Sequence, residues 1–255
     1  MKNVWVIAKR DAGSYFNSPV FYVVTTVFLV IFSFIFFNIL NFFSFQSLQA
    51  GQFRSMNIGL NLNEMVIEPS FHNMAVILLL MIPVITMRSF SEEKKSKTFA
   101  LLLSSPVHLK EIIFGKFLAC MAVIGLMILL SAYSTGFLFL LGEPDTGPVV
   151  TGYVGILLMA GCYVGLGVFA SSLTDNQIIA AVIAFGFSLF MWIIGWAAQA
   201  AGSGWGEVLQ FLSLIDHLDR FLKGIFDTSD LVFYLSFIAF FLFLTHRVLD
   251  SQRWR

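Results

Sequence analysis

Charged side chains are scarce in this chain, and they are missing altogether from several long stretches. Only 12% of its 255 residues are Asp, Glu, Lys or Arg, about half of the ~25% that is usual in soluble domains. Residues 12–53 carry no charged side chain. Further stretches without charge cover residues 69–87, 117–142, 146–174, 176–206 and 231–246. Because a bilayer core needs about 20 mostly apolar residues in a helix, these absences predict a polytopic membrane protein.

Other absences exclude classes of function. The phosphate-binding pattern G-x-x-x-x-G-K-[ST] occurs nowhere in the chain, so we expect no nucleotide site and no enzymatic activity of its own. The two cysteines, Cys120 and Cys162, fall in different apolar segments, and no Cys/His pattern has metal spacing. We expect packing residues there, with no disulfide and no metal. A net charge of zero gives no basic surface for nucleic acid.

Six apolar segments are long enough to cross a membrane, and lipid requires each to be a helix. Their predicted ranges are 20–43, 71–88, 117–141, 151–171, 178–199 and 230–247. We therefore expect one all-α transmembrane domain over residues 1–255. Among the 15 Lys and Arg residues, only Arg54, Arg220 and Lys223 fall between spans on the other side from the termini. This asymmetry predicts that both termini are cytoplasmic. No acid lies in the middle of a span, which argues against an ion-coupled carrier.

Two flanking segments have amphipathic patterns. Residues 2–12, with Trp5 and basic residues, are typical of a helix in the inner interface, although a plain positive flank is the alternative. Residues 205–226 repeat apolar side chains at a helical period, which predicts an outer amphipathic helix, broken once, before the last span. Its charges suggest two i,i+4 pairs, Asp216 with Arg220 and Asp219 with Lys223.

Small residues also show a pattern. Gly161 and Gly165 are spaced for close helix packing, either inside the chain or between two chains.

The segment 88–116 is the most informative polar region. It predicts a cytoplasmic helix over about 90–103, then a break at Ser104–Pro106, with Ser105 as the N-cap of a second helix that continues into the third span. The first helix begins charged and ends apolar at Phe99–Leu103, which favours contact with another protein. The short turn 171–177 lies on the same side of the membrane.

The motifs of this region carry a resemblance. The residues concerned are Glu92-Glu93-Lys94-Lys95-Ser96-Lys97-Thr98, Leu101-Leu102-Leu103, Ser105-Pro106-Val107, Gly115-Lys116 and the turn Ala170 to Ala181. Together they resemble permeases of the second (ABC-2-like) class of ABC-type exporters, and the end of the chain is similar to the gliding-motility branch. Lys97 stands where that family usually has Gly, which predicts a more continuous coupling helix here.

The resemblance implies a permease subunit of the bacterial inner (plasma) membrane without its own ATPase. ATP and Mg would bind to a partner ATP-binding-cassette ATPase, and no cofactor would bind this chain directly. It implies a homodimer or heterodimer of permeases among membrane lipids, with room for an auxiliary envelope protein. The substrate stays open.

The resemblance also implies where the ATPase couples. The candidate coupling residues are Arg88, Glu92, Glu93, Lys94, Lys95, Lys97, Thr98, Phe99 and Leu102. The candidate residues of the second cytoplasmic turn are Ser171, Ser172, Thr174, Asp175, Asn176 and Gln177. An alternative function is an ATP-driven platform for an envelope or gliding machine that exports no substrate.

Overall fold

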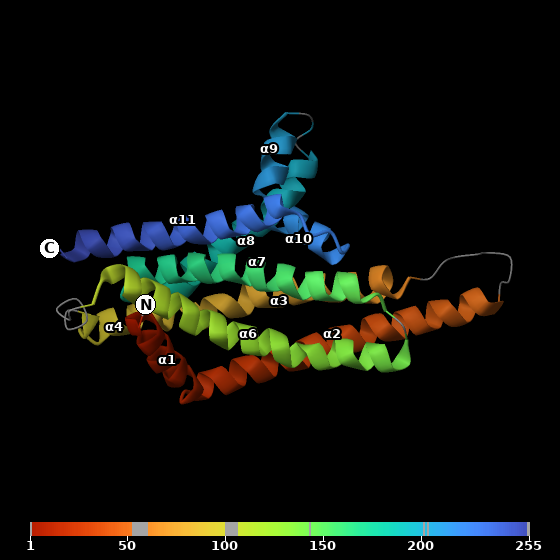
Figure 1. Ribbon diagram of the computed structural model, residues 1–255, viewed down its shortest axis with the longest axis horizontal. Coiled ribbons are helices and arrows are strands. Elements are labelled where there is room, and N and C mark those ends of the chain that lie inside the picture. Colours follow the sequence, from red (N-terminus) through yellow and green to blue (C-terminus); the bar gives the residue numbers. More distant parts are fainter. Residues whose placement is uncertain are drawn as a thin grey trace.

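The computed structural model describes residues 2–52, 61–99, 107–142, 144–200, 202 and 204–253. These residues form an elongated helical bundle (Figure 1). Its long helices are α2 (Pro19–Gln52), α3 (Glu68–Thr86), α6 (Leu109–Leu141), α7 (Thr146–Leu173), α8 (Gln177–Ala200) and α11 (Thr228–Arg253). The shorter ones are α1 (Lys2–Phe16), the π-helix η1 (Asn63–Ile67), α4 (Arg88–Lys95), α9 (Trp205–Leu212) and α10 (Leu214–Leu222).

Six helices are long and apolar enough to cross a membrane, and they coincide with the six predicted spans. The all-α membrane fold is thus confirmed. The helix α1, the helix α4, the end of α7 and the C-terminal end of α11 gather at one end of the bundle, called here the α4 end (Figure 1). The opposite end, with η1 and α10, is called the α10 end. The segments predicted to share one side of the membrane therefore share one end of the molecule.

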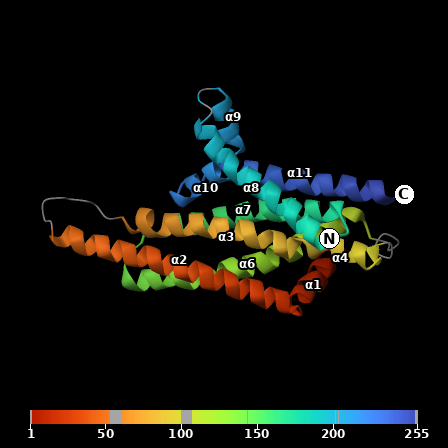
Figure 2. The same cartoon turned by 180° about the vertical axis from the view of Figure 1, so that it is seen from behind.

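The helix α7 forms the centre of the bundle because small residues let its neighbours come close. In the most apolar stretch of α7, 78% of the residues are buried, compared with 22% in the most apolar stretch of α11. A Cβ at Gly161 would lie 2.9 Å from Ile238 of α11, and one at Gly155 would lie 2.7 Å from Phe221 of α10. The predicted close packing at Gly161 and Gly165 thus occurs inside the chain. The helix α8 instead leaves the bundle and projects sideways with α9 (Figures 1 and 2).

The amphipathic segment after α8 is broken once, as the sequence predicts. The break falls at Ser213, whose Oγ accepts a hydrogen bond from the Asp216 amide (3.3 Å) and caps α10. The expected i,i+4 ion pairs do not form. Arg220 instead lies 3.3 Å from Asp230 of α11, and Asp219 lies 3.2 Å from His72 of α3. The prediction was wrong because tertiary partners are less exposed to water, which strengthens those pairs.

The coupling helix is shorter than predicted. It ends at Lys95, and the chain then turns through Lys97, which has a φ of +57°. The Thr98 amide donates to the Glu93 carbonyl (3.0 Å) and the Lys97 amide to the Lys94 carbonyl (3.1 Å). These two bonds form a Schellman motif, whose left-handed position favours glycine. Lys97 therefore adopts a backbone conformation that favours glycine, and the prediction of a continuous helix over 90–103 was wrong.

The helix that continues into the third span begins later than predicted, at Leu109 instead of directly after Ser105. His108 is extended (φ −69°, ψ 138°) and α6 starts at Leu109. The Glu111 side chain accepts a hydrogen bond from the His108 amide (3.3 Å), which satisfies one donor at the helix start. Ser105 is therefore not the N-cap of α6; it and Leu102 lie outside the described residues.

Candidate functional site

The two predicted coupling segments meet at one hydroxyl group. Ser171 Oγ at the end of α7 accepts hydrogen bonds from the amides of Phe90 (2.9 Å) and Ser91 (3.1 Å). It also donates to the Met87 carbonyl (3.0 Å). In an uninterrupted helix, each of these amides would bond to the carbonyl four residues before it. The Ser171 side chain is thus inserted into the backbone ladder between α3 and α4, which is a recognised cause of a helix kink.

A glycine one turn earlier makes this insertion possible. A Cβ at Gly167 would lie only 2.1 Å from Thr86 Oγ1, so any side chain there would push α7 away from α3. Gly167 and Ser171 lie on the same face of α7 because they are four residues apart. The pair holds the junction of α3 and α4 tightly against α7.

Lys94 and Phe99 also contact the rest of the chain. Lys94 Nζ donates to the Ser172 carbonyl at the end of α7. The Phe99 ring packs edge-on against the Phe90 ring, with centroids 6.4 Å apart, and Lys94 Nζ lies 5.6 Å from the centre of the Phe99 ring. Lys94 therefore fastens α4 to α7, whereas Phe99 packs back against α4 itself.

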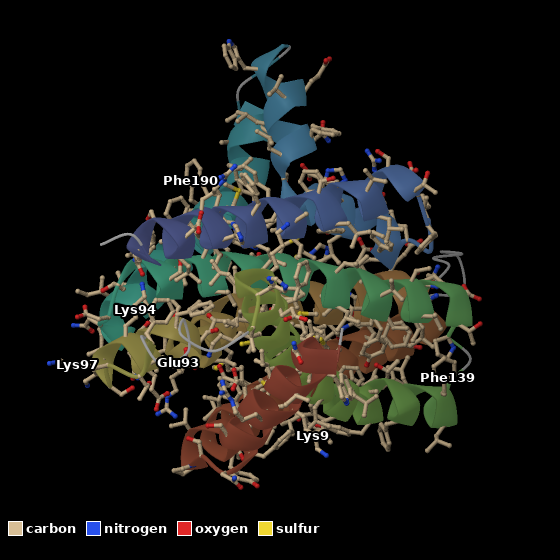
Figure 3. All side chains as sticks on the ribbon, turned by 60° about the vertical axis from the view of Figure 1, so that its left-hand side comes forward. Lys9, Glu93, Lys94, Lys97, Phe139 and Phe190 are labelled. Carbon is tan, nitrogen blue, oxygen red and sulfur yellow. The ribbon has the colours of Figure 1, made fainter. Side chains whose placement is uncertain are left out.

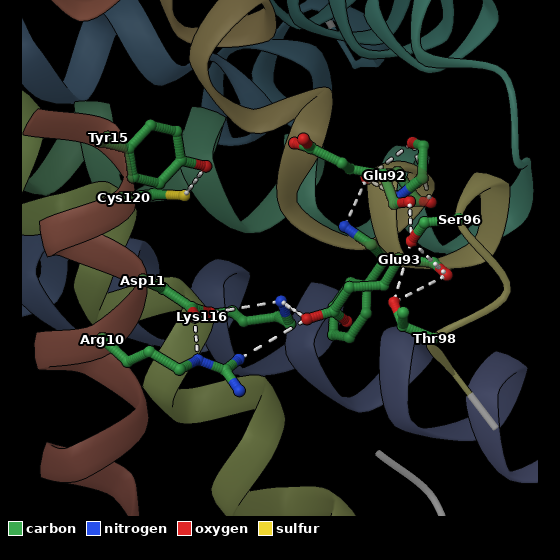
Figure 4. A network of polar contacts seen from close by, with 12 residues as sticks. Arg10, Asp11, Tyr15, Glu92, Glu93, Ser96, Thr98, Lys116 and Cys120 are labelled. Carbon is green, nitrogen blue, oxygen red and sulfur yellow. Dashed lines mark hydrogen bonds and ion pairs between the residues drawn. The ribbon is translucent and has the colours of Figure 1, made fainter. Parts of the chain in front are cut away.

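Four charged side chains join α4 to α1 and α6 (Figure 4). Lys116 Nζ on α6 lies 2.8 Å from Glu93 and 3.2 Å from Asp11. Arg10 on α1 lies 2.8 Å from Asp11 and 3.6 Å from Glu93. Only 5% of the Lys116 side chain is exposed, so it needs these carboxylates to offset its desolvation. The hydrogen bond from Arg10 to Asp11 raises the pKa of the Arg10 guanidinium.

Tyr15 links α1 to the span α3 as well. Its hydroxyl donates to the Ile85 carbonyl (3.1 Å) and lies 3.5 Å from Cys120 Sγ (Figure 4). Burial raises the pKa of this phenol well above its ordinary value. Tyr15 is therefore a neutral donor that fixes the interfacial helix to two spans.

Part of the predicted coupling set remains exposed. On and after α4, the exposed side chains are those of Glu92, Lys95, Lys97 and Thr98. In Figure 3, Lys97 projects away from the bundle, whereas Glu93 lies on the side of α4 that faces other helices. Arg88 is half-buried, and its Nη1 donates to Ser18 Oγ (3.0 Å).

The predicted residues of the turn after α7 also divide into buried and exposed side chains. Ser171 and Ser172 are fully buried, Thr174 and Gln177 are half-buried, and Asp175 and Asn176 are exposed. Asn176 Oδ1 accepts a hydrogen bond from the Ile178 amide (2.9 Å), so it caps the start of α8.

Sequence reasoning missed Arg10, Asp11 and Lys116 as members of this site. One signal was available, because Asp11 is the first acid in the chain and stands beside a base in a flank that is otherwise basic. Its partners lie on elements far apart in sequence, so the contact itself was not visible.

These features define a polytopic α-helical membrane protein with a charged, tightly fastened junction at the end that holds both termini. The chain matches the family model described as ABC-2 family transporter protein over residues 5–254, and it belongs to that family. It is thus a membrane component of an ABC-type transporter, a class that relies on an ABC ATPase partner. The match does not extend to the gliding-motility branch. A comparison with curated proteins gives no match.

Proposed function

We propose that this chain is the permease subunit of an exporter in the inner membrane of a bacterium, and that a separate ATPase docks on α4 from the cytoplasm. The observation that carries the proposal is the Ser171 insertion, which makes the α3–α4 junction and the end of α7 one rigid unit. A force on α4 would therefore reach two membrane spans without being absorbed by a flexible linker.

The charged side chains extend this unit to the other helices of the α4 end. Glu93 is paired with Lys116 of α6, and both contact residues of α1. The interfacial helix and the third span would therefore move with α4. Closure of an ATPase dimer needs only a few kcal/mol of preference for one conformation to shift such an equilibrium, since about 5.5 kcal/mol moves it from 1:99 to 99:1.

The exposed and inward residues of the predicted set take different roles in this proposal. Glu92, Lys95, Lys97 and Thr98 would contact the ATPase because their side chains are exposed. Arg88, Glu93 and Lys94 would transmit the movement because they contact residues outside α4. Phe99 would brace α4 because it packs against Phe90. Two permease chains, identical or different, would assemble with two ATPase chains that bind ATP and Mg.

The proposal is tested by purifying the tagged full chain from its own host in mild detergent and identifying co-purified proteins by mass spectrometry. We expect a Walker-motif ATPase in about equal amount. Glu92→Lys and Lys95→Glu should each reduce the recovered ATPase without changing the thermal unfolding of the permease. Lys9→Glu is the matched control, because it reverses a charge on the exposed face of α1. Full ATPase recovery with both α4 variants would contradict docking on α4.

The alternative function, an ATP-driven platform for an envelope or gliding machine, shares the same ATPase. Reconstitution of the purified complex in liposomes separates the two. An exporter should hydrolyse ATP faster when its substrate is present, whereas a platform should respond only to the machine that it drives.

A further inference from the structure

A cavity of about 320 Å³ lies at the α10 end, between α3, α10 and the C-terminal part of α8. Here α8 separates from the other long helices, as Figure 2 shows. The volume falls within the range of about 300–1,000 Å³ that is typical of sites for small molecules. The residues that line the cavity include none of the predicted coupling residues, so it is distinct from the proposed ATPase contact.

Two tryptophans of α8 form one wall of this cavity. The ring centroids of Trp192 and Trp196 lie 4.6 Å apart and the ring planes are inclined by 58°, so the two rings form a corner. Ala75, Val76 and Ile215 add apolar lining from α3 and α10. The face of an aromatic ring carries the negative part of its quadrupole and attracts cations. The cavity therefore combines apolar surface with an affinity for positive charge.

Two carboxylates of α10, those of Asp216 and Asp219, line the same cavity. Asp219 already lies 3.2 Å from His72 of α3. Asp216 has no such partner in the described part of the chain, because Arg220, which the sequence predicts beside it, lies 3.3 Å from Asp230 instead. The described residues of the lining include no lysine or arginine. Negative charge in the cavity therefore exceeds positive charge, whether or not His72 is protonated.

A glycine brings the tryptophan wall close to the acid without a partner. A Cβ at Gly195 would lie 2.7 Å from Ser213 Oγ and 3.9 Å from Asp216 Oδ2, so α8 approaches the start of α10 closely at this position. Gly195 lies between Trp192 and Trp196 in the chain, so this carboxylate and the two rings border the same space. Asp216 is also half-buried, which limits the screening of its charge by water.

The electrostatics of the second acid agree with an excess of negative charge. Burial raises the pKa of Asp219, the charge of His72 opposes this rise only in part, and the charge of Asp216 adds to it. A cation held beside the two carboxylates would offset their repulsion, because an opposite charge favours the ionised form of an acid.

We infer that this cavity binds a small organic cation with an N-methylated ammonium group. The methyl groups would lie against the rings of Trp192 and Trp196, and the Asp216 carboxylate would be the counter-ion. Aromatic walls are a common means of recognising quaternary ammonium groups. A primary ammonium is strongly hydrated and has three N–H donors to satisfy, which the apolar part of the lining does not do. The lining therefore favours the methylated cation over the primary one.

The test measures binding to the purified full chain by isothermal titration calorimetry in a maltoside detergent, with the heat of the detergent alone subtracted. Three ligands are compared: choline, ethanolammonium, which has the charge without the methyl groups, and the uncharged isostere of choline in which carbon replaces nitrogen. We expect choline to bind about tenfold more tightly than either of the others. Binding needs no ATPase, so the result is independent of the proposed function.

Two substitutions with matched controls test the residues of the cavity. Asp216→Asn and Trp196→Leu should each weaken choline binding by about three- to tenfold. Glu207→Gln and Trp205→Leu make the same kinds of change at exposed residues of α9 that do not line the cavity, so binding should stay the same. Thermal unfolding of the four variants checks that each chain is folded.

Three results would overturn the inference. If choline did not bind, or bound no more tightly than its uncharged isostere, the cavity would not recognise a cation. If ethanolammonium bound as tightly as choline, the ligand would not be a methylated cation. If folded Asp216→Asn and Trp196→Leu chains bound choline as tightly as the unsubstituted chain, the ligand would bind elsewhere.

Discussion

At both ends of the bundle a short helix packs against α7 and charged side chains join that helix to others, but the cavity beside the charges is larger at the α4 end (about 580 Å³) than at the α10 end (about 320 Å³). At the α10 end, Gly155 brings α7 against Phe221, and Thr151 Oγ1 donates to the Phe221 carbonyl (2.6 Å). At the α4 end, Gly167 and Ser171 make an equally close contact, yet the neighbouring charges line a cavity of about 580 Å³. The α4 end therefore has more open space beside its charged side chains than the α10 end has.

The two ends also differ in how many acids are available to their cations. At the α10 end, the fully buried Asp230 lies 2.5 Å from His217 and 3.3 Å from Arg220. In the described part of the chain it is the one carboxylate that pairs with His217, whereas Arg220 also has Asp227 at 3.8 Å. His217 Nε2 also lies 2.9 Å from the Phe211 carbonyl, so both ring nitrogens face acceptor oxygens. At the α4 end, two acids serve two cations. At the α4 end, loss of one acid therefore leaves each cation with a carboxylate partner. At the α10 end, loss of Asp230 leaves His217 without one.

The largest effect should come from removing the single acid. We expect Asp230→Ala to lower the free energy of unfolding by about 3 kcal/mol, because it leaves His217 buried without its partner. Glu93→Ala should cost only about 1 kcal/mol, because Lys116 keeps Asp11. Denaturant unfolding in detergent measures both. Asp227→Asn, at a half-exposed partner 3.8 Å from Arg220, is the control and should be nearly neutral, because it removes the charge but keeps an oxygen that can accept the hydrogen bond from the Ser229 amide. Equal losses for Asp230→Ala and Glu93→Ala would remove the distinction between the two ends.

The inserted hydroxyl of the α4 end comes next. Ser171→Ala should cost about 1–3 kcal/mol, since the Phe90 and Ser91 amides would lose their acceptor in a buried site. Ser172→Ala is a matched control, because the one hydrogen bond of Ser172 Oγ among the described residues goes to the Phe169 carbonyl within α7 itself (2.7 Å). The same denaturant experiment compares them. If Ser171→Ala were as mild as Ser172→Ala, Ser171 would not hold the junction.

A smaller effect should distinguish the ends of the two short helices. Both close with a Schellman motif, at Lys97 (φ +57°) after α4 and at Gly224 (φ +80°) after α10. A side chain in this left-handed conformation costs about 1 kcal/mol. Lys97→Gly should therefore stabilise the chain by about that amount, and Gly224→Lys should destabilise it by at least as much. Thermal unfolding of the two variants tests whether the two changes in stability have opposite signs. A loss of stability with Lys97→Gly would show that the Lys97 side chain makes a contact that stabilises the fold by more than its backbone strain destabilises it.

The sequence predicts the spans well and the junctions poorly, for a physical reason. Spans depend on composition along one segment, so charge-free runs locate α2 and α7 closely. The end of α4 was missed because Lys97 is a poor residue for the conformation it adopts, and local propensity yields to the packing of Phe90 and Phe99.

The candidate site shows the same division. Sequence motifs identified α4 and the turn after α7, but not that Ser171 would enter the backbone of α4 or that Lys116 would join Asp11 to Glu93. Such contacts join residues more than 20 positions apart. They depend on helix placement, which a single sequence does not encode in any local pattern.

The smallest effect should be a difference in acid response between the ends. At the α10 end, burial raises the pKa of Asp219 above its ordinary value of 3.8, and the charge of His72 opposes this only in part. The folded chain therefore holds this proton more tightly than the unfolded chain, so the contribution to stability is complete below pH 3.8 and is lost as pH rises through the raised pKa. At the α4 end, the pKa values of Arg10 and Tyr15 are raised, but Arg10 stays charged and Tyr15 stays neutral throughout the acid range. The difference in unfolding free energy between the unsubstituted chain and Asp219→Asn should therefore depend on pH, whereas the difference for Arg10→Gln should not. An equal pH response of the two variants would locate the acid sensitivity elsewhere.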